Sequence, residues 1–516
     1  MAGKGKSILF LGIDVGTGGT RALIIDEHGK VVASGTEEHA HFASPRAGWA
    51  EQDPQDWWRA CRLAVRQAVR NAGTGGDAIA CVGFSGQMHG AVLLDAADEV
   101  VRPAIIWCDQ RTERQVEELA SLFGTERLIQ LTCNPPLTNF TLTKLLWVRE
   151  NEPKNWRRVA HVMLPKDFVR FRLTGERAID MADASGTLLL DVTNRKWSAE
   201  MQSRSGIEEK LLPSLWESPQ ICGRINGSGA EATGLKPGTP VVAGAGDQAA
   251  GAVGMGIVRP GTVSVSIGTS GVVFAATDGP ALDPQGRLHT FCHAIPGRWH
   301  VMGVTQAAGL SLRWFRDRFG AGREDGRDPY DRLCEEAATA PAGASGVLWA
   351  PYLMGERTPY CDPNARAALV GLAASHTRAD IIRAILEGVA FSLKDSFTIF
   401  REMNLPVQRV RLGGGGARSA LWRQIQADVY GGTVEIVKAE EGAAYGAAIL
   451  AGVGAGGWKS VDEACDAIVQ TAQQIKPDSQ NMLVLEQSYR AYRRIYPALS
   501  GILPATTVEA NIHPAS

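Results

Sequence analysis

Short apolar runs bounded by glycine-containing turns recur along the chain and predict buried strands. The runs Ser7–Ile13 and Arg21–Asp26 flank a glycine-rich turn, and a third run at Val31–Ser34 follows a second turn. This spacing predicts a meander of three strands. Asp56–Asn71 has apolar residues at helical spacing instead, and a buried strand is predicted at Ile79–Phe84. Strands that alternate with helices indicate an α/β fold.

The strand–turn–strand pattern of the N-terminus occurs again after the middle of the chain. The strands predicted at Thr262–Ile267 and Val272–Ala276 enclose a second glycine-rich turn. This turn, Gly268-Thr-Ser-Gly271, resembles Gly16-Thr-Gly-Gly19 and follows it by 252 positions (from 16 to 268). Such a repeat indicates a duplicated architecture, although with 58 glycines a short match also arises by chance. The other elements predicted in this half are helices at Gly309–Phe319 and Ala379–Arg401 and strands from Val347 and at Val410–Leu412.

Composition, charge and cysteine usage exclude several classes of protein. The 516 residues are 45% hydrophobic and 21% charged, which suits two or three globular domains. The net charge is -2, so no basic excess points to nucleic acid. The 9 cysteines form no Cys-x-x-Cys pair, which is typical of free thiols in a reducing compartment. Apolar runs are too short for a signal peptide or a membrane span, so we expect a cytoplasmic protein with no membrane partner.

A stretch near the middle of the chain combines a predicted strand, a tight turn and one carboxylate. Val241-Val-Ala243 predicts a buried strand, Gly244-Ala-Gly246 lets the backbone approach a ligand, and Asp247 opens a helix of small residues. An acid in the first turn of a helix is often only a cap. Glycine-rich turns at Asp14–Arg21 and Ser266–Gly271 favour another hypothesis, in which Asp247 is a catalytic base between two phosphate-binding loops. With an ordinary pKa of about 3.9, this base would be ionised but weak.

The two repeated turns differ in one residue that bears on metal binding. Asp14 precedes the first turn, and the corresponding residue before the second turn is Ser266. Backbone amides and hydroxyls of glycine–threonine turns can hold phosphate, but only the first turn carries a carboxylate that could organise Mg²⁺. The other interpretation of the first turn is an ordinary glycine-rich hairpin.

Two further glycine-containing loops follow predicted strands. Ser85-Gly-Gln-Met-His-Gly90 presents the backbone amides of Met88 and His89 to a small polar ligand, although a lone loop histidine is more often structural. Gly413-Gly-Gly-Gly-Ala-Arg418 passes close under a purine or ribose in one interpretation and is a flexible turn in the other. Neither loop identifies a function by itself.

Several common signatures are absent from the sequence. It has neither a G-x-x-x-x-G-K-[ST] loop nor the H-R-D and D-F-G motifs, which excludes a P-loop NTPase and a protein kinase. His289, Cys292, His293 and His300 lie close together and raise the question of a zinc site. His289 and His293 share one face of a predicted strand, but no fourth ligand is evident, so a structural role is favoured.

The combination of these motifs resembles the FGGY family of carbohydrate kinases over nearly the whole chain. As a set, the motifs are far more specific than any one of them. Those that carry the resemblance are Asp14–Arg21, Ser85–Gly90, Trp107–Thr112, Lys144–Glu150, Gly246–Gly254, Ser266–Gly271, Gly355–Pro359, Ala367–Leu372, Asp380–Glu387, Gly413–Ser419 and Glu441–Ala448.

The resemblance implies an α/β fold with two actin-like (ribonuclease H-like) domains and a cleft between them. We expect an N-terminal domain over residues 1–255 with the sugar site and the catalytic base. A C-terminal domain over residues 256–500 is expected to bind the nucleotide, and residues 501–516 are expected to form a tail. A homodimer is common in the family and is a possible assembly here.

The resemblance also implies ATP-dependent phosphorylation of a sugar hydroxyl, with D-xylulose as the expected sugar. Asp247 matches the family's general base, and Asp14 matches the acid near Mg²⁺ and the γ-phosphate. Met88 and His89 match sugar-binding positions of the branch that phosphorylates D-xylulose. The remaining expected contacts are Trp107 and Gln248 for the sugar and Thr17, Gly18, Arg21, Gly268, Thr269, Gly309, Gly414, Gly415 and Gly416 for ATP.

Two residues depart from the family pattern, and three alternative functions stay open. Gln248 stands where many relatives of this branch have asparagine, and Asn139 stands where the first family signature begins with Met, Phe, Tyr, Gly or Ser. The alternatives are a kinase for ribulose, L-xylulose, gluconate or another polyol, an actin-like or chaperone-like ATPase, and an inactive sugar sensor. The Ser85–Gly90 loop argues against the first two, and intact Asp14 and Asp247 argue against the third.

Overall fold

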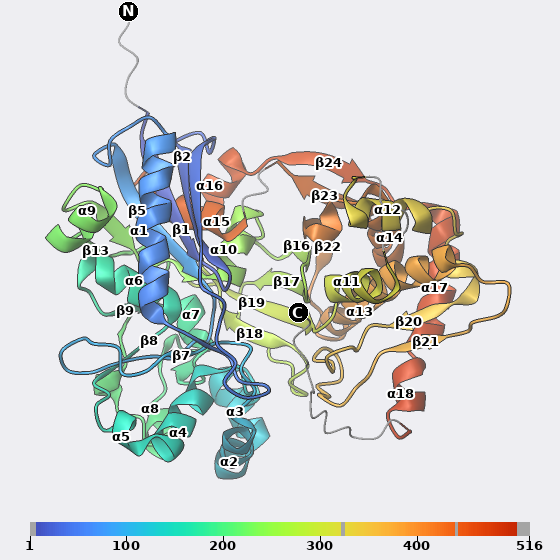
Figure 1. Ribbon diagram of the computed structural model, residues 1–516, viewed down its shortest axis with the longest axis horizontal. Helices are drawn as coiled ribbons and strands as arrows, with labels where there is room; N and C mark the ends of the chain where they lie inside the picture. Colours follow the sequence, from blue (N-terminus) through green and yellow to red (C-terminus); the bar gives the residue numbers. More distant parts are fainter. Residues whose placement is uncertain (1–6, 321–325, 439–441, 503–516) are drawn as a thin grey trace, which may run out of the picture.

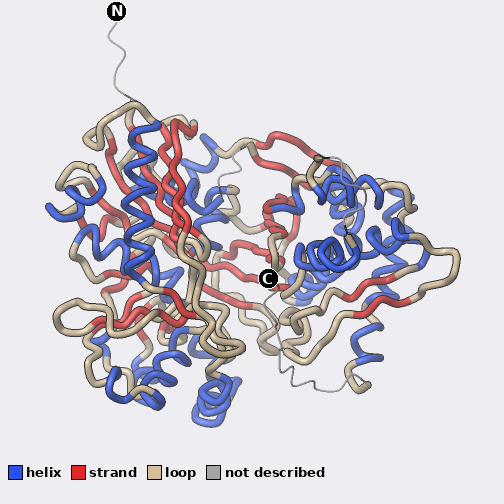
Figure 2. Tube along the Cα trace, viewed as in Figure 1, coloured by secondary structure: helices blue, strands red, loops and turns tan. Residues whose placement is uncertain are grey.

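The computed structural model describes residues 7–320, 326–438 and 442–502, and its main elements are two seven-stranded sheets with helices packed on them (Figure 1, Figure 2). The first sheet consists, in order, of β13 (Ile221–Arg224), β14 (Pro240–Val242), β5 (Ile79–Gly86), β1 (Leu9–Val15), β2 (Gly19–Asp26) and β3 (Val31–Glu38), with β15 (Ala245–Gly246) beside β5. The second consists of β18 (His289–Cys292), β19 (Trp299–Thr305), β17 (Gly271–Thr277), β16 (Gly261–Ile267), β22 (Val407–Gly414), β23 (Val434–Val437) and β24 (Thr471–Ile475).

Helices cover both sheets, and shorter elements fill the region between β5 and β13. The helices that contact the first sheet are α1 (Pro54–Asn71), α6 (Pro165–Thr174), α10 (Asp247–Gly254) and α15 (Gly442–Gly454), and α9 (Gly227–Thr233) packs on α1 and α6. Around the second sheet lie α11 (Gly309–Phe319), α12 (Pro329–Ala337), α13 (Arg378–Glu402), α14 (Ala420–Tyr430), α17 (Ser479–Tyr492) and α18 (Ile495–Leu499). α16 (Val461–Ile468) packs on α15 and α10 beside the first sheet. The elements in the region between β5 and β13 include α2 (Glu113–Phe123), α3 (Thr125–Thr132), α4 (Thr141–Asn151), α5 (Pro153–Trp156), α7 (Met181–Ser185), α8 (Ala199–Ser205) and β7 (Ala104–Ile105), which pairs with β4 (Glu51–Gln52). In the second half of the chain, β20 (Leu348–Ala350) pairs with β21 (Ala368–Val370).

The two sheets confirm the predicted duplication. β1 pairs antiparallel with β2 and parallel with β5, and β16 pairs in the same two ways with β17 and β22. Asp14 and Ser266 occupy the same position, the next-to-last residue of β1 and of β16. The carboxylate in one copy and the hydroxyl in the other therefore mark equivalent places in two equivalent sheets.

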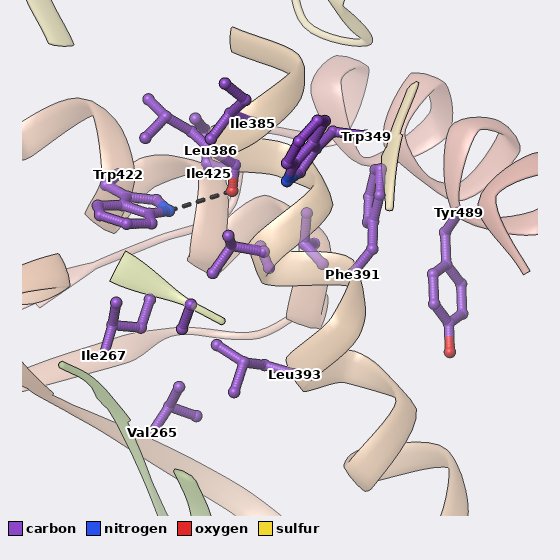
Figure 3. Packing of buried hydrophobic residues seen from close by; sticks show 14 of the residues in the cluster. Val265, Ile267, Trp349, Ile385, Leu386, Phe391, Leu393, Trp422, Ile425 and Tyr489 are labelled. Carbon is purple, nitrogen blue, oxygen red and sulfur yellow. Dashed lines mark hydrogen bonds between the residues drawn. The ribbon is translucent and has the colours of Figure 1, made fainter. Parts of the chain in front are cut away.

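Helix α13 forms the core of the second half. Thr377 and Asp380 close its N-terminus as a capping box, in which each side chain accepts a hydrogen bond from the backbone N–H of the other residue. Figure 3 shows Leu393 of this helix directed toward the sheet residues Val265 and Ile267. The indole Nε1 of Trp422 on α14 donates to the backbone oxygen of Leu386, 3.1 Å away, and so joins the two helices.

Helix α15 belongs to the second half of the chain but packs on the first sheet. It contacts β1, β5 and α10, and Figure 1 shows it beside these elements, between the two halves. Glycines make the approach possible: a Cβ on Gly446 would lie 1.8 Å from the backbone oxygen of Ala250, and one on Gly12 would lie 2.0 Å from that of Ala444. The division of the chain at residue 255 stays a prediction, because elements of both halves share this contact.

Replacing Gly446 by valine is expected to destabilise the protein strongly. The added carbons have no room against the backbone of α10, so we expect the free energy of unfolding to fall by about 3 kcal/mol, the upper end for overpacking. Gly251→Ala on α10 is the matched control, because nothing lies within 4 Å of its Cβ position. Alanine favours a helix by up to about 1 kcal/mol over glycine, so this variant should be neutral or slightly stabilised. Urea unfolding of both variants measures the difference, and equal midpoints would contradict the tight contact.

The main predicted strands and helices are confirmed, with boundaries shifted by a few residues. The predicted helix at Gly309–Phe319 coincides with α11, and the helix predicted at Ala379–Arg401 is α13 with one more residue at each end. Glu441 and residues 503–516 of the predicted tail lie outside the described residues. Among the described helices, none has the length and apolar character that crossing a membrane requires.

Candidate active site

Three neighbouring strand ends bring the two predicted carboxylates together. Asp14 on β1 is the register partner of Ser85 on β5, and Ser85 is the partner of Ala245 on β15. All three strands run in the same direction, so their carboxyl ends meet at one edge of the sheet. Asp247 follows Ala245 by two residues and is the first residue of α10. The tight turn at Gly244, with φ +81°, directs the chain from the strand into this helix.

The carboxyl group of Asp14 lies almost entirely within protein, with a small opening to solvent. Burial raises its pKa, and nearby Ser85 and Arg21 lower it by less. Asp14 Oδ1 is buried without a hydrogen-bond partner within the described residues, and the buried hydroxyl of Ser85 has no partner there other than the carboxyl group of Asp14. Buried polar atoms without partners are rare in proteins, so Asp14 Oδ1 suits a ligand.

Asp247 is a stronger base than the sequence led us to expect. Burial raises its pKa to about 7, and repulsion by the carboxylate of Asp14 acts in the same direction. The backbone N–H and the side chain of Gln248 lower the pKa by less. The expectation of an ordinary, weakly basic aspartate is therefore wrong. A carboxyl group with a pKa near 7 accepts a proton more readily and suits general base catalysis near neutral pH.

The loop after β5 places Met88 against the turn that precedes Asp247. A Cβ on Gly246 would lie 2.8 Å from Cγ of Met88, so the methionine packs directly on this turn. His89 has a left-handed backbone (φ 66°), and its ring Nδ1 is 2.9 Å from the oxygen of Gly186. Lys144 Nζ donates to the backbone oxygen of His89 at 3.0 Å. The loop predicted to bind a small polar ligand is thus held rigidly beside Asp247.

The ring of His89 is buried and neutral. Burial lowers its pKa well below the ordinary value, and the charge of Lys144 lowers it further. The ring packs edge-on against Phe140 with centroids 5.1 Å apart. A neutral imidazole with a fixed orientation can offer a hydrogen bond but carries no charge, which suits an uncharged polar ligand.

The structure brings Thr17 and Trp107 together, although the sequence assigned them to different ligands. Trp107 Nε1 donates to Oγ1 of Thr17 at 2.9 Å. Gln52 Nε2 donates to the backbone oxygen of Thr17 at 2.8 Å, and Gln87 Nε2 donates to Oε1 of Gln52 at 2.9 Å. Sequence reasoning missed both glutamines, although Gln87 lies in the loop it had singled out. Gln248 is the second residue of α10, directly beside Asp247.

A cavity of about 240 Å³ in the second half collects most of the predicted nucleotide residues. Gly268, Thr269, Gly309, Gly415 and Gly416 line it together. The other lining residues, which the sequence did not assign to ATP, are Ile267, Leu312, Arg313, Asp328, Tyr330, Asp331, Cys334, Arg418, Ser419 and Trp422. The amide N–H of Gly309 donates to the oxygen of Gly268 at 2.9 Å, which joins the start of α11 to the repeated turn.

Four predicted nucleotide residues do not line this cavity. Gly414 lies beneath it with φ +71°, and a Cβ there would be 2.5 Å from the oxygen of Ile267. Thr17, Gly18 and Arg21 belong to the first sheet, where Arg21 is the register partner of Asp14. They lie with the carboxylates rather than with the cavity, so the expected ATP residues form two groups, one in each half.

The carboxylate oxygens of Asp14 suit a hard cation that a nucleotide also helps to bind. Carboxylate oxygens are the ligands that Mg²⁺ prefers, and Asp14 Oδ1 is a buried oxygen without a partner. Within residues 7–320, 326–438 and 442–502, no three His, Cys, Asp or Glu side chains gather as a metal site would require. Mg²⁺ bound through one or two carboxylates completes its coordination with water and phosphate oxygens. Asp14 therefore fits this ion together with a nucleotide.

Comparisons with known proteins agree with this geometry. A xylulose kinase from Bacillus subtilis (strain 168) is 38% identical over 486 residues, 94% of this chain and 96% of that relative. The crystal structure of xylulose kinase from Rhodospirillum rubrum matches with a TM-score of 0.89 and 31% identity, covering 96% of this chain and 99% of the other. A gluconate kinase structure from Lactobacillus acidophilus also has a TM-score of 0.89, at 25% identity and the same coverage.

Two family models account for most of the sequence. Residues 9–254 match the N-terminal domain of the FGGY family of carbohydrate kinases, and residues 263–455 match its C-terminal domain. The duplicated α/β sheets, the paired carboxylates and the glycine-lined cavity are consistent with both matches. The chain belongs to the FGGY family of carbohydrate kinases.

Proposed function

We propose that the protein transfers the γ-phosphoryl group of ATP to the C5 hydroxyl of D-xylulose, with Mg²⁺ as cofactor. The observation that carries the proposal is the meeting of Asp14, Ser85 and Asp247 at one sheet edge, beside Met88 and His89. Xylulose kinases with similar sequence and fold support the choice of sugar. The family implies ATP as the phosphoryl donor.

The proposed roles follow from the positions of the side chains. Asp247 accepts the proton of the attacking hydroxyl, and Met88, His89, Trp107 and Gln248 surround the sugar. The cavity of the second half takes the adenosine, and its glycine turn takes the phosphates, as glycine-rich turns do. Asp14 would hold Mg²⁺, which neutralises phosphate charge when bound.

Phosphoryl transfer asks little covalent chemistry of these residues. Catalysis comes mainly from positioning the two substrates and stabilising charge. The hydroxyl loses its proton to Asp247 as its oxygen attacks phosphorus, so the proton acceptor must lie within hydrogen-bond reach of that hydroxyl. Closure of the two halves over the sugar would exclude water, which would otherwise compete as the acceptor.

The test of the proposal is ADP release with ATP and Mg²⁺, measured without sugar and then with D-xylulose, D-ribulose, L-ribulose, L-xylulose, gluconate and glycerol. We expect a strong preference for D-xylulose. Preference for gluconate is the second candidate, because a gluconate kinase shares the fold at the same TM-score as the xylulose kinase structure. If the rate of ADP release is the same with and without each sugar, the proposal is overturned in favour of an ATPase.

The pH dependence of the reaction should report the ionisation of Asp247. The base works only when ionised, and its pKa of about 7 means that ionisation is lost as the pH falls through that value. We expect kcat/KM for the sugar to fall about tenfold per pH unit on the acid side. A cation at Asp14 lowers the pKa of Asp247, so a higher Mg²⁺ concentration should move the acid side of the kcat/KM profile to lower pH. A profile that stays flat to pH 5 at low Mg²⁺ would contradict a base with this pKa.

Replacing Gly415 by valine is expected to weaken ATP binding selectively. The nearest atom to its Cβ position is the oxygen of Ile267 at 3.7 Å, so the backbone accepts a side chain that then projects into the cavity. We expect the KM for ATP to rise at least tenfold with little change for the sugar. Gly432→Val, with nothing within 4 Å of its Cβ position and outside the cavity lining, is the control. Equal KM values for ATP in both variants would remove this cavity as the nucleotide site.

The location and assembly of the protein are also proposals. We infer a cytoplasmic enzyme, since all nine cysteines are unpaired thiols in the structure. A homodimer is the assembly to test by light scattering.

A further inference from the structure

Arg357 extends from the second half of the chain and is anchored by its neighbours on the second sheet. It lies in the loop between β20 and β21. The next residue, Thr358, is joined to Val304 of β19 by two hydrogen bonds, each of 3.0 Å: its N–H donates to the backbone oxygen of Val304, and its Oγ1 accepts from the N–H of Val304. The backbone N–H of Arg357 donates to Oε1 of Glu356 at 2.8 Å. The starting point of the arginine side chain is therefore fixed on the end of β19.

A continuous row of packed rings leads from β19 to the loop that carries Met88 and His89. Met302 of β19 pairs with His289 of β18. The ring of His289 packs edge-on against Phe140 with centroids 5.7 Å apart, and Phe140 packs edge-on against His89 at 5.1 Å. The second sheet thus lies directly against the sugar-side loop of the first half, and the loop of Arg357 lies at this contact.

The charge of Arg357 acts on His89 of that loop and on groups packed beside it. Burial is the main reason for the low pKa values of His89, His289 and Lys144, and the positive charge of Arg357 acts on all three in the same direction. Among the described residues, the charged group that acts on the carboxyl of Asp247 is Asp14 and not Arg357. The guanidinium therefore lies nearer to His89, His289 and Lys144 than to the carboxyl group of Asp247.

Protein groups within the described residues balance the guanidinium of Arg357 only in part: burial lowers its pKa, and the nearby Cys361 and Glu356 raise it by less. Arg357 is half-buried and forms no ion pair or side-chain hydrogen bond there. The adjacent carboxyl of Glu356 is used elsewhere: it accepts from the backbone N–H groups of Gln306 and Arg357, at 2.9 and 2.8 Å, and from the hydroxyl of Ser392 at 3.3 Å. The guanidinium N–H donors of Arg357 form no hydrogen bond to the protein within the described residues, so they are available to a ligand.

The proposed reaction defines which oxygen atoms reach this end of the site. The furanose ring of a ketopentose is closed by its C5 hydroxyl on C2, so a sugar phosphorylated at C5 reacts in the open-chain form. That form has a free C2 carbonyl next to the C1 hydroxyl, and both are remote from C5. A guanidinium presents parallel N–H donors in a planar fork, which matches two oxygens on neighbouring carbons.

We propose that Arg357 binds the C1 hydroxyl and C2 carbonyl of the open-chain ketose, and so selects ketoses over the corresponding alditols. This inference rests on the proposed function. It assigns to the second half of the chain a direct contact with the sugar, in addition to the nucleotide.

The test compares D-xylulose with xylitol, which lacks the carbonyl, in the wild type, Arg357→Ala and Arg357→Lys. For D-xylulose we measure KM and kcat, and for xylitol we measure the inhibition constant in competition with D-xylulose. For Arg357→Ala we expect a 10- to 100-fold rise in the KM for D-xylulose, the loss typical of a hydrogen bond to a charged group. The inhibition constant of xylitol should change less than about threefold, and the KM for ATP should not change. Guanidinium at millimolar concentration should partly restore the KM of Arg357→Ala, which a structural role would not allow.

Arg357→Lys keeps the positive charge but not the planar fork, so its KM should lie between those of the other two proteins. It also supplies the comparison if Arg357→Ala does not fold. Arg401→Ala, an exposed arginine at the end of α13, is the control and should match the wild type. If Arg357→Ala weakens the binding of D-xylulose and of xylitol equally, or changes neither, the role of Arg357 is overturned while the proposed function stays intact. A wild type without activity on D-xylulose would overturn both.

Discussion

Replacing Asp247 by asparagine or alanine is expected to reduce sugar phosphorylation by about 10³- to 10⁴-fold while ATP still binds. A general base contributes typically 10²- to 10⁴-fold, and Asp247 is the carboxyl group whose pKa, about 7, suits this role near neutral pH. The nucleotide cavity lies in the other half of the chain, so the substitution should leave it unchanged. ADP release measures the first effect, and titration calorimetry with ATP measures the second.

The exposed Asp77→Asn provides a matched control for the loss of one negative charge and should retain wild-type turnover. The Asp247→Asn substitution keeps the shape of the side chain, so a loss of activity without a loss of thermal stability would isolate the proton acceptor. Near-normal turnover of Asp247→Asn would remove Asp247 from the mechanism, whatever the sugar.

Replacing Asp14 by asparagine is expected to lower kcat by about 10²- to 10³-fold and to raise the Mg²⁺ concentration needed for half-maximal activity. Asp14 offers a buried oxygen without a protein partner in the described part of the chain, where it would hold Mg²⁺, and a cation next to the transferring phosphate is worth about this factor. Ser266→Ala at the equivalent position of the second sheet is the matched control. Because Ser266 carries no charge, its removal should leave the Mg²⁺ requirement unchanged.

The same substitution offers a second readout that does not depend on turnover. The carboxylate of Asp14 raises the pKa of Asp247, so a neutral side chain at position 14 should lower the pKa of Asp247 in the metal-free protein. Carboxyl-carbon NMR of the aspartates measures this change. An unchanged pKa together with an unchanged Mg²⁺ requirement would show that the two carboxyl groups do not act as a pair.

The positions of the carboxylates could be predicted because they depend on local chain geometry. A polar residue beside a glycine-rich turn at the end of a buried strand lies at the carboxyl end of the sheet, and this holds for Asp14, Ser85 and Asp247 alike. The duplication was visible for the same reason, since equal turns follow equal strands. Most of the glycines assigned to ATP, such as Gly268 and Gly415, lie together because they end the two central strands of the second sheet.

Other features could not be predicted because they arise between segments far apart in the sequence. The pKa of Asp247 depends on burial by elements of the whole first half and on its distance from Asp14. The contact of Trp107 with Thr17 joins two loops separated by 90 positions, and no local pattern indicates it. Arg357 reaches the sugar side through the packing of the two sheets, which only the tertiary structure specifies.

The position of α15 has a consequence for how the protein is made. The face of the first sheet that α15 covers is complete in sequence when Gly254 leaves the ribosome, but its covering helix ends at Gly454. At typical rates of synthesis these 200 positions (254 to 454) take roughly 10–40 seconds. During that interval β1 and β5 lack the contacts that α15 makes with them, although α1, α6 and α10 are already present. Newly made N-terminal segments are thus candidates for chaperone binding, and the nascent chain cannot cover this face of its first sheet until α15 has been synthesised.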